Sequence, residues 1–547
     1  MPADSTTALR PILRLRADVP APLQPAAWKS TRLAVVALGA VFVLWGASAV
    51  ELGPDEAKLG LASGESLGPF GKAFGYWDPS IWPASVALGH AWAWFEERGP
   101  SQDAIRWPSA IAGLVVGFVL ARRARLIQGP RAGLLVALAW YGSLGLMDHS
   151  SANLDLIAGL GTVGALDLLL CGRAGWVVGC WASLAFLAAG WPPLALIAMV
   201  TVVLGRPGMW SWKAVVPVAA TMVAWSTWAL GVAPAEAWAS ALALPITQAS
   251  AWNLALVAAA LGLPWSPFVL LATSRSIREP WSSLGHGLTL GWIKILGASL
   301  IVGSLVPGFS RASLVPALAG LAFVSATCWD RLWTDSALLP EGVTRRASRL
   351  ALLMSGLWLA VVLGWGGYVG FVVAYYRATM IGVGVVSLTA FLLAVRSVRL
   401  GEVRWALGAV VALSVALKLA HWGYYAPELN YRTGAGPWGR AIGQWVPEKQ
   451  PIYVLHTWPA DLAFATGRPF RQLETPMHID YQPGTGSKFV LLQDSEFAEY
   501  QNWSKGWPKL IKVAEFEDEM GLGKRYLTRT DAPLIVERPF RKNDPVE

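Results

Sequence analysis

The sequence predicts an α-helical polytopic membrane protein of about 13 transmembrane helices, followed by a small C-terminal α/β domain outside the membrane. Three observations support this fold class: the composition, a series of apolar spans, and a one-sided distribution of arginine and lysine. Of the 547 residues, 54% are hydrophobic and only 14% are charged, and the mean hydropathy is +0.45. These values exclude an ordinary soluble globular protein.

Most of the apolar spans approach the length that a membrane crossing needs. About 20 helical residues cover a hydrocarbon layer of about 30 Å. The pair around 174–205 is short and is interrupted by "GWPP", so it is the weakest of the set. The spans lie at 33–52, 106–121, 132–147, 153–170, 174–190, 192–205, 213–231, 252–273, 288–306, 312–329, 350–371, 378–395 and 404–421.

Basic residues orient these spans. With the N-terminus inside, the cytoplasmic tail and the short cytoplasmic loops hold 21 arginines and lysines, whereas the short exterior loops hold only Arg311 and Arg377. This distribution follows the positive-inside rule. We therefore predict a cytoplasmic tail (1–32), a domain in the cytoplasmic (inner) membrane (33–421) and a periplasmic region (422–547). The net charge of +9 follows from this orientation and does not indicate nucleic-acid binding.

Two predicted exterior regions are large. The first exterior loop, 53–105, contains "PDEAK" and an aromatic-rich helix after Pro83. The C-terminal region is polar, and its short apolar stretches are typical of strands separated by turns. The predicted strands are "PIYVL", "KFVLLQ", "LIKVAEF", "RYLTRT" and "PLIVERP", with helices at "PADLAFATG" and "DSEFAEYQNW".

Asp55 and Glu56 lie about where the first span should leave the bilayer. Charged side chains at this depth are costly unless they are paired, hydrated or functional. Pro54 can occupy the first helical position, and carboxylates in the first turn then interact favourably with the helix dipole. Helix capping therefore explains the acidic pair without any chemistry. The alternative is a catalytic carboxylate presented to a cavity at the outer membrane surface.

Four motifs follow one another along the chain: "PDEAK" after the first span, "AIRWPSAIAGL" opening the second, "MDHSSANLDLIAGL" at 147–160 and "PGFSRASLVPALAGLAF" at 307–323. Their order resembles the polyprenyl-phosphate-sugar-dependent glycosyltransferases of the GT-C fold, in particular the lipid A aminoarabinose transferases and protein O-mannosyltransferases. The C-terminal "PIYVLHTWPADLAFATGRPFRQL" is similar to the soluble domain of the aminoarabinose transferases. The chain departs from the family in two places: "WDPSIWP" has Asp78 where the lysine of a Lys-Pro-Pro-Leu motif is usual, and Lys58 and Leu59 stand where the family has an arginine and an aromatic residue.

The resemblance implies a glycosyltransferase that moves a sugar from a polyprenyl-phosphate-linked donor to a lipid, glycan or protein acceptor at the outer face of the membrane. We expect Asp55 to accept the proton of a hydroxyl nucleophile, assisted by Glu56 or Asp155. Cations ease the departure of the lipid phosphate by neutralising its developing charge. Arg311, whose planar fork suits phosphate, and Lys58 are the expected donor-phosphate ligands.

Asp155 and Arg311 also fit purely structural roles, the first as a capping carboxylate at a helix start and the second as a snorkelling side chain at a helix end. The acidic pair can hold a divalent cation beside a phosphate, but no His–Glu spacing requires one. A catalytically silent relative and a solute or lipid transporter are the alternative functions. A transporter should show broken helices, repeat symmetry and polar groups within spans, and Lys294 is the only charge predicted well inside a span.

The predicted orientation can be tested with topology reporters. Reporter fusions after residue 430 should report the exterior, and fusions within 122–131 should report the cytoplasm, because the basic loops stay inside. A cytoplasmic signal after residue 430 would contradict both the topology and the side of the membrane assigned to the site.

Overall fold

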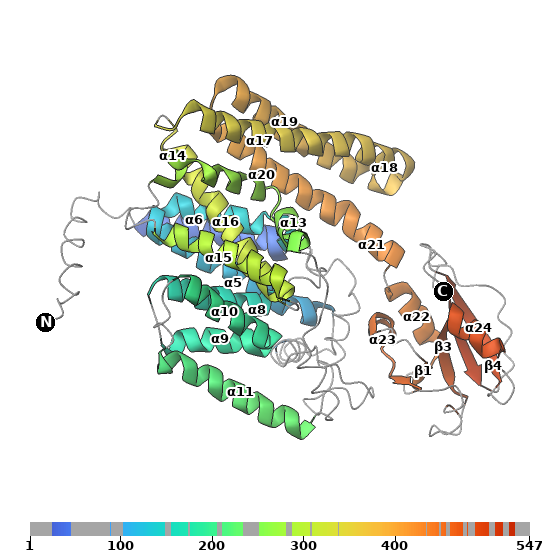
Figure 1. Cartoon of the computed structure of the whole chain (residues 1–547). Coiled ribbons are helices and arrows are strands. Elements are labelled where there is room, and N and C mark those ends of the chain that lie inside the picture. The colour runs from blue at the N-terminus through green and yellow to red at the C-terminus, as the bar shows by residue number, and fades with distance from the viewer. Residues whose placement is uncertain are drawn as a thin grey trace.

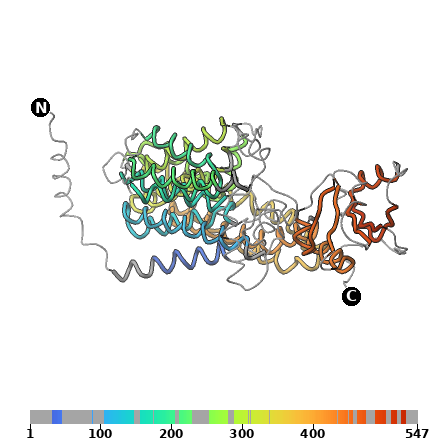
Figure 2. The backbone as a smooth tube through the Cα atoms, turned by 90° about the horizontal axis from the view of Figure 1, so that it is seen from below, coloured from blue at the N-terminus to red at the C-terminus, as the bar shows by residue number. Residues whose placement is uncertain are grey.

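The computed structural model describes residues 25–44, 88, 102–147, 155–172, 175–204, 211–232, 251–279, 287–306, 309–336, 338–433, 435–447, 450–455, 460–473, 479, 487–502, 509–517 and 524–530. Long helices lie side by side in one bundle, and a five-stranded sheet lies beyond one end of it (Figures 1 and 2). We call this end of the bundle the sheet end.

Most of the bundle's helices overlap the predicted apolar spans. In chain order they are α2 (Pro25–Gly39), η3 (Ala40–Leu44), α5 (Gln102–Gln128), α6 (Pro130–Tyr141), α7 (Leu144–Met147), α8 (Leu156–Leu170), α9 (Trp176–Ala189), α10 (Trp191–Val203), α11 (Trp212–Val232), α13 (Ala251–Leu261), η5 (Ser266–Thr273), α14 (Arg275–Arg278), α15 (Gly287–Leu305), α16 (Ser310–Thr334), α17 (Glu341–Val361), η7 (Val362–Gly366), α18 (Gly367–Val372), η8 (Ala374–Tyr376), α19 (Arg377–Leu400), α20 (Val403–Ala420), η9 (His421–Tyr425) and α21 (Ala426–Thr433).

Several of these helices are long enough to cross a membrane. Within the described ranges, five helices have the necessary length and apolar composition, and a sixth is added if one bent pair is a single span. Four more apolar helices are shorter: Arg32–Leu44, Leu156–Leu170, Trp176–Ala189 and Trp191–Val203. The chain is therefore a largely helical protein with several membrane-spanning helices, and the total of about 13 spans stays a prediction.

Two predicted spans differ from the structure. The span at 252–273 is two helices, Asn253–Leu261 and Ser266–Thr273, which meet at 110°. Pro264 lies at this break, and proline cannot donate the backbone hydrogen bond that would continue the first helix. The span predicted to end at 421 instead continues through η9 and α21 to residue 433. Lys418 consequently lies inside a long helical run.

Two ion pairs hold helices together at the end of the bundle away from the sheet. Arg123 of α5 makes a bidentate contact with Asp167 of α8, with Nε–Oδ1 and Nη2–Oδ2 distances of 2.7 and 2.6 Å. Arg131 of α6 donates from Nε to Asp330 Oδ1 of α16 at 2.7 Å. Both arginines are among the basic residues that the sequence predicts in cytoplasmic loops. Their ion pairs join α8 to α5 and α16 to α6.

The C-terminal sheet has the strand order β2-β1-β3-β5-β4. The strands are β1 (Ile452–Val454), β2 (Phe470–Gln472), β3 (Phe489–Gln493), β4 (Leu510–Glu517) and β5 (Lys524–Thr530). β1 pairs in parallel with β2 and β3, whereas β5 is antiparallel to both β3 and β4. The structure confirms four of the predicted strands. The stretch "PLIVERP" lies outside the described residues, and β2 was missed because its three residues carry no apolar alternation.

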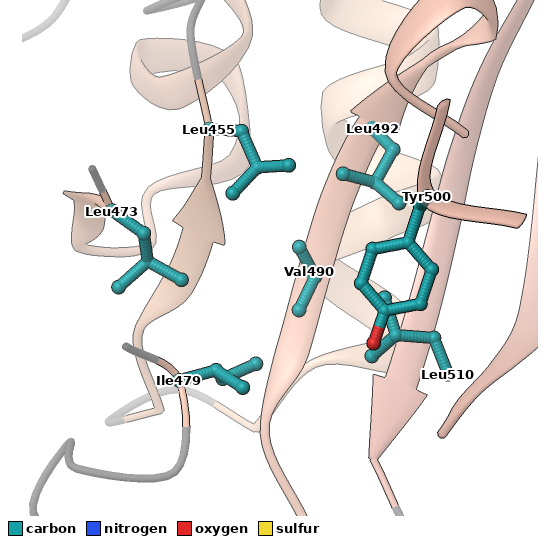
Figure 3. A pocket seen from close by; sticks show the side chains of 7 residues that line it. All are labelled: Leu455, Leu473, Ile479, Val490, Leu492, Tyr500 and Leu510. Carbon is teal, nitrogen blue, oxygen red and sulfur yellow. The ribbon is translucent and has the colours of Figure 1, made fainter. Parts of the chain in front are cut away.

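Apolar side chains cover both faces of the sheet. Trp438 and Ile442 of α22 (Gly436–Trp445) and Leu462 of α23 (Ala460–Thr466) belong to the core on one face. On the other face, next to α24 (Asp494–Asn502), there is a cavity of about 10 Å³. It is lined by Leu455, Leu473, Ile479, Val490, Leu492, Tyr500 and Leu510 (Figure 3). This volume is at the lower limit for one water molecule, so the cavity is a packing gap and does not admit a sugar.

The pair between Arg123 and Asp167 should contribute strongly to stability. Its side chains are 19% and 7% exposed, and removing one partner of a buried pair leaves an uncompensated charge that costs about 3–5 kcal/mol. We expect Asp167→Ala to lower the thermal unfolding midpoint of the detergent-solubilised protein clearly.

The matched control is Glu341→Ala, which removes an ion pair with Arg345. In that pair the arginine and glutamate side chains are 64% and 81% exposed. Exposed pairs contribute about 0–1 kcal/mol, so this variant should unfold close to the wild-type temperature. Equal shifts in the two variants would contradict the structural role of the buried pair.

Candidate functional site

The predicted site residues are only partly described. Asp155 and the backbone of Arg311 are described, whereas Asp55, Glu56 and Lys58 lie outside the described residues. Within the described ranges, no group of three or more His, Cys, Asp or Glu side chains is placed to hold a metal ion. The acidic pair that could hold a divalent cation is not among these residues.

Asp155 is the N-cap of α8. Its Oδ1 accepts a hydrogen bond from the backbone N–H of Ala158 at 2.9 Å. The side chain is half-buried at the start of the helix. The capping role expected as one alternative is thus confirmed, and it holds the carboxylate at a defined position beside the positive end of the helix dipole.

Helices α8 and α16 approach each other closely next to these positions. A Cβ atom at Gly159 would lie 2.3 Å from Val315 Cγ1, so any larger residue at 159 would force Val315 or a helix to shift. Gly159 comes one helical turn after Asp155, and Val315 comes one turn after Arg311. Positions 155 and 311 therefore belong to adjoining helix starts, and only a glycine at 159 permits this contact.

Helix α5 runs parallel to α8 and begins at the same end. A Cβ atom at Gly113 would lie 3.2 Å from Leu156 Cδ1, and about three turns further along both helices Arg123 contacts Asp167. Arg106 lies two turns before Gly113 and is only 2% exposed. The sequence motif "AIRWPSAIAGL" contains this arginine, but sequence reasoning gave it no role. The feature of the sequence that could have indicated this residue is its position: Arg106 is a basic residue at the start of an apolar span.

The "GWPP" stretch also packs at this end. Gly190, with φ of 76°, separates α9 from α10, and this left-handed conformation favours glycine. The first residue of α10, Trp191, makes an edge-to-face contact with Phe309 at 5.1 Å between ring centroids. Phe309 is the N-cap residue of α16. The short hairpin is therefore present, and it covers the helix start that carries Arg311.

Lys418 is a second residue that sequence reasoning missed. Its side chain is 2% exposed, and Nζ donates a hydrogen bond to the carbonyl oxygen of Phe42 at 2.6 Å. The sequence predicted only Lys294 as a charge well inside a span, because the last predicted span ends shortly after Lys418. The helix instead continues to residue 433, so Lys418 lies well inside the helical run.

This arrangement suits the binding of an anion. Three parallel helices, α5, α8 and α16, begin at one end of the bundle, and each helix N-terminus carries a partial positive charge. The positions of Arg106, Arg311 and Asp155 lie at this same end of the bundle. A phosphate could be stabilised here next to an acidic group, which is the combination that transfer from a phosphate-linked donor requires.

No family model and no curated protein sequence matches the chain. Among solved structures, the chain is similar to ArnT from Cupriavidus metallidurans bound to undecaprenyl phosphate, with a TM-score of 0.69 and 16% identity over 94% of this chain and 100% of that one. For the apo state of that ArnT, the TM-score is 0.68 at 17% identity, over 92% and 98% of the two chains. The archaeal oligosaccharyltransferase AglB from Archaeoglobus fulgidus matches at a TM-score of 0.40 and 12% identity, over 81% and 64%.

ArnT is a glycosyltransferase of the GT-C fold. The likeness to ArnT extends over nearly the whole of both chains, and at this identity it establishes the fold. The resemblance predicted from the order of the motifs is thereby confirmed: the chain has the GT-C fold.

Proposed function

We propose that the chain is a membrane glycosyltransferase that uses a polyprenyl-phosphate-linked sugar as donor and a lipid, glycan or protein as acceptor. The observation that carries this proposal is the contact between Gly159 and Val315. It brings the helix starts with the acidic position 155 and the basic position 311 together. The fold is shared with ArnT, which has been crystallised with undecaprenyl phosphate.

In the proposed reaction, an oxygen of the acceptor attacks the anomeric carbon of the sugar while the bond from that carbon to the phosphate oxygen breaks. The polyprenyl phosphate leaves with the bonding electrons, and the proton of the acceptor hydroxyl passes to Asp55. Arg311 and Lys58 stabilise the charge that develops on the leaving phosphate. Glu56 and Asp155 position the reacting groups, and Asp155 does so from its place at the cap of α8. If the acceptor is itself a phosphate, Asp55 positions it and takes no proton.

The proposed enzyme lies in the cytoplasmic membrane, with its site at the outer face. About 13 spans cross the cytoplasmic membrane with the N-terminus inside, and the sheet region follows on the periplasmic side. The support is the one-sided distribution of basic residues in the sequence. The site then opens to the outer face, where a lipid-linked sugar arrives within the membrane plane.

A transporter is the main alternative, and the break between α13 and η5 is the observation that favours it, because transporters bind substrates at broken helices. The backbone groups near this break, however, are used for packing. Ser325 donates to the carbonyl of Trp265 at 2.9 Å, and the N–H of Leu144 donates to the carbonyl of Leu263, also at 2.9 Å. These two hydrogen bonds connect neighbouring helices at the break.

A catalytically silent relative is the second alternative. The observation behind it is Asp78, which stands in "WDPSIWP" where the family usually has a lysine. An acidic residue at that position would repel a donor phosphate. Sugar transfer by the wild-type protein decides between this alternative and the proposed enzyme.

Replacing Asp55 tests the chemistry. Asp55→Asn should lower the rate of sugar transfer by ~10²–10⁴-fold, the usual contribution of a general base, while folding stays intact because asparagine also caps helices. The measurement is transfer of radiolabelled sugar from extracted polyprenyl-phosphate donor to membrane acceptors. Asp155→Asn, which also keeps a cap, should reduce transfer less. Full activity in Asp55→Asn would disprove its catalytic role, and wild-type protein inactive with every donor would favour the alternatives.

Replacing Arg311 tests the phosphate site. Arg311→Ala should weaken donor binding in nanodiscs by ~1.5–3 kcal/mol, the value of a hydrogen bond to a charged group. Arg311→Lys should restore part of the affinity, because lysine keeps the charge but lacks the bidentate fork. The matched control is Arg377→Ala, which removes the other basic residue of the predicted short exterior loops. Unchanged donor binding in Arg311→Ala would assign this arginine to membrane anchoring.

A further inference from the structure

Three neighbouring helices carry exposed arginines at the end of the bundle away from the sheet. The hairpin of α17 and α19 lies along the top edge of the bundle in Figure 1. The arginines lie at the start of α17, at the end of α19 and at the start of α20. We call these six residues the arginine cluster: Arg345, Arg346, Arg349, Arg396, Arg399 and Arg404.

Direct contacts between the helices bring the members of the cluster together. The hydroxyl groups of Ser348 on α17 and Ser397 on α19 share a buried hydrogen bond of 2.8 Å. These serines are the sequence neighbours of Arg349 and Arg396. The Arg396 guanidinium also lies 4.0 Å from the centroid of the Trp405 ring of α20, in a cation–π contact. The three helix ends therefore form one basic surface.

The cluster has more positive than negative charge. Arg345 pairs with Glu341 at 2.7 Å, and Arg404 pairs with Glu402, also at 2.7 Å. Six arginines against these two carboxylates leave a net charge of +4. Three of the arginines have no ion-pair partner within the described parts of the chain: Arg346, Arg349 and Arg399. A surface of this kind is complementary to an anion.

The length of α19 indicates the depth of the cluster in the membrane. The helix has the length and apolar composition of a membrane span, and residues 378–395 between Arg377 and Arg396 contain no charged side chain. At the helical rise of 1.5 Å per residue, the two arginines are about 28 Å apart, close to the ~30 Å thickness of the hydrocarbon layer. If Arg377 lies at one membrane surface, Arg396 lies at the other, among the lipid head groups.

One face of α19 is apolar over this length and ends in arginines. Its apolar members are spaced four, three and four residues apart, and the same spacing continues to Arg396 and Arg399, so all of them share a helix face. These apolar side chains are exposed in the bundle: Ile381, Val385, Leu388 and Leu392. An acyl chain can follow this face while the head group of the same lipid reaches the arginines.

Helix α17 has the same pattern in the opposite chain direction. Leu353 and Leu357 are 59% and 61% exposed, and their spacing places them on one face with Arg346 and Arg349. Two neighbouring helices thus each present an apolar face that ends in the arginine cluster. This arrangement matches a lipid with two acyl chains and an anionic head group.

We infer that the arginine cluster binds the phosphate of an anionic phospholipid, whose acyl chains lie along the exposed faces of α17 and α19. The guanidinium fork suits phosphate oxygens, and basic groups beside membrane helices attract anionic lipids. A zwitterionic lipid carries a cation of its own, which the positive cluster repels. The cluster lies at the end of the bundle opposite to the candidate site, so this inference is independent of the proposed function.

The inference is tested by native mass spectrometry of the full-length, detergent-solubilised protein. The protein is titrated with phosphatidylglycerol and with phosphatidylcholine of equal chain length. We expect the wild type to bind phosphatidylglycerol at least tenfold more tightly. Arg349→Gln/Arg399→Gln should weaken the binding of phosphatidylglycerol at least fivefold and leave that of phosphatidylcholine unchanged. Equal affinities of the wild type for the two lipids would overturn the inference.

The matched control is Arg122→Gln/Lys213→Gln, which removes two exposed basic residues of α5 and α11 at the same end of the bundle. This variant should bind phosphatidylglycerol with an affinity within twofold of the wild type. An equal loss in the two variants would mean a general attraction to basic residues and would overturn the site. Displacement of the lipid by excess glycerol 3-phosphate would also overturn it, because the acyl chains would then contribute nothing.

If the variant Arg349→Gln/Arg399→Gln does not give a monodisperse protein, Glu341→Gln is measured in the same titration. It removes the carboxylate of an exposed pair and leaves Arg345 unpaired. The affinity for phosphatidylglycerol should then rise at least twofold. An unchanged or lower affinity would count against the inference.

Discussion

The close approach of α8 and α16 at Gly159 is the constraint on which the candidate site depends. A side chain at this position would collide with Val315, so either Val315 or the two helices would have to shift. The ion pairs Arg123–Asp167 and Arg131–Asp330 hold the same two helices at their other ends. Helices fixed at both ends are rigid supports, and rigid supports place reactive groups more accurately than loops do.

The acidic residues of α8 and α16 have different roles at the two ends of the bundle. At the end away from the sheet, Asp167 and Asp330 are paired with arginines, so their charges are neutralised where the surroundings are apolar. At the sheet end, Asp155 caps α8, and the positive ends of three helices meet with basic positions 106 and 311. Helix N-termini favour anions, and this suits a phosphate-linked donor in the proposed function.

The helical run 403–433 connects the two parts of the molecule. Through Lys418 it contacts the first helix, and through η9 it contacts the aromatic residues of the hairpin formed by α17 and α19. The π-helical turns η3, η7 and η9 lie where these contacts form. Such turns offer backbone carbonyls and altered side-chain directions that a regular helix lacks. They allow an apolar bundle to make specific polar contacts near one end.

The sequence alone determined the helical spans, their expected orientation, most of the strands and, through the order of the motifs, the GT-C fold. These features depend on local properties: the length of an apolar run, the alternation of side chains and the charge of adjoining loops. The tertiary structure decided that 252–273 bends, that Asp167 and Asp330 are paired, that Arg106 is buried and that Lys418 meets Phe42. Each of these depends on which helices become neighbours. Side chains distant in the sequence meet only after the helices have packed, so no local pattern specifies their partners.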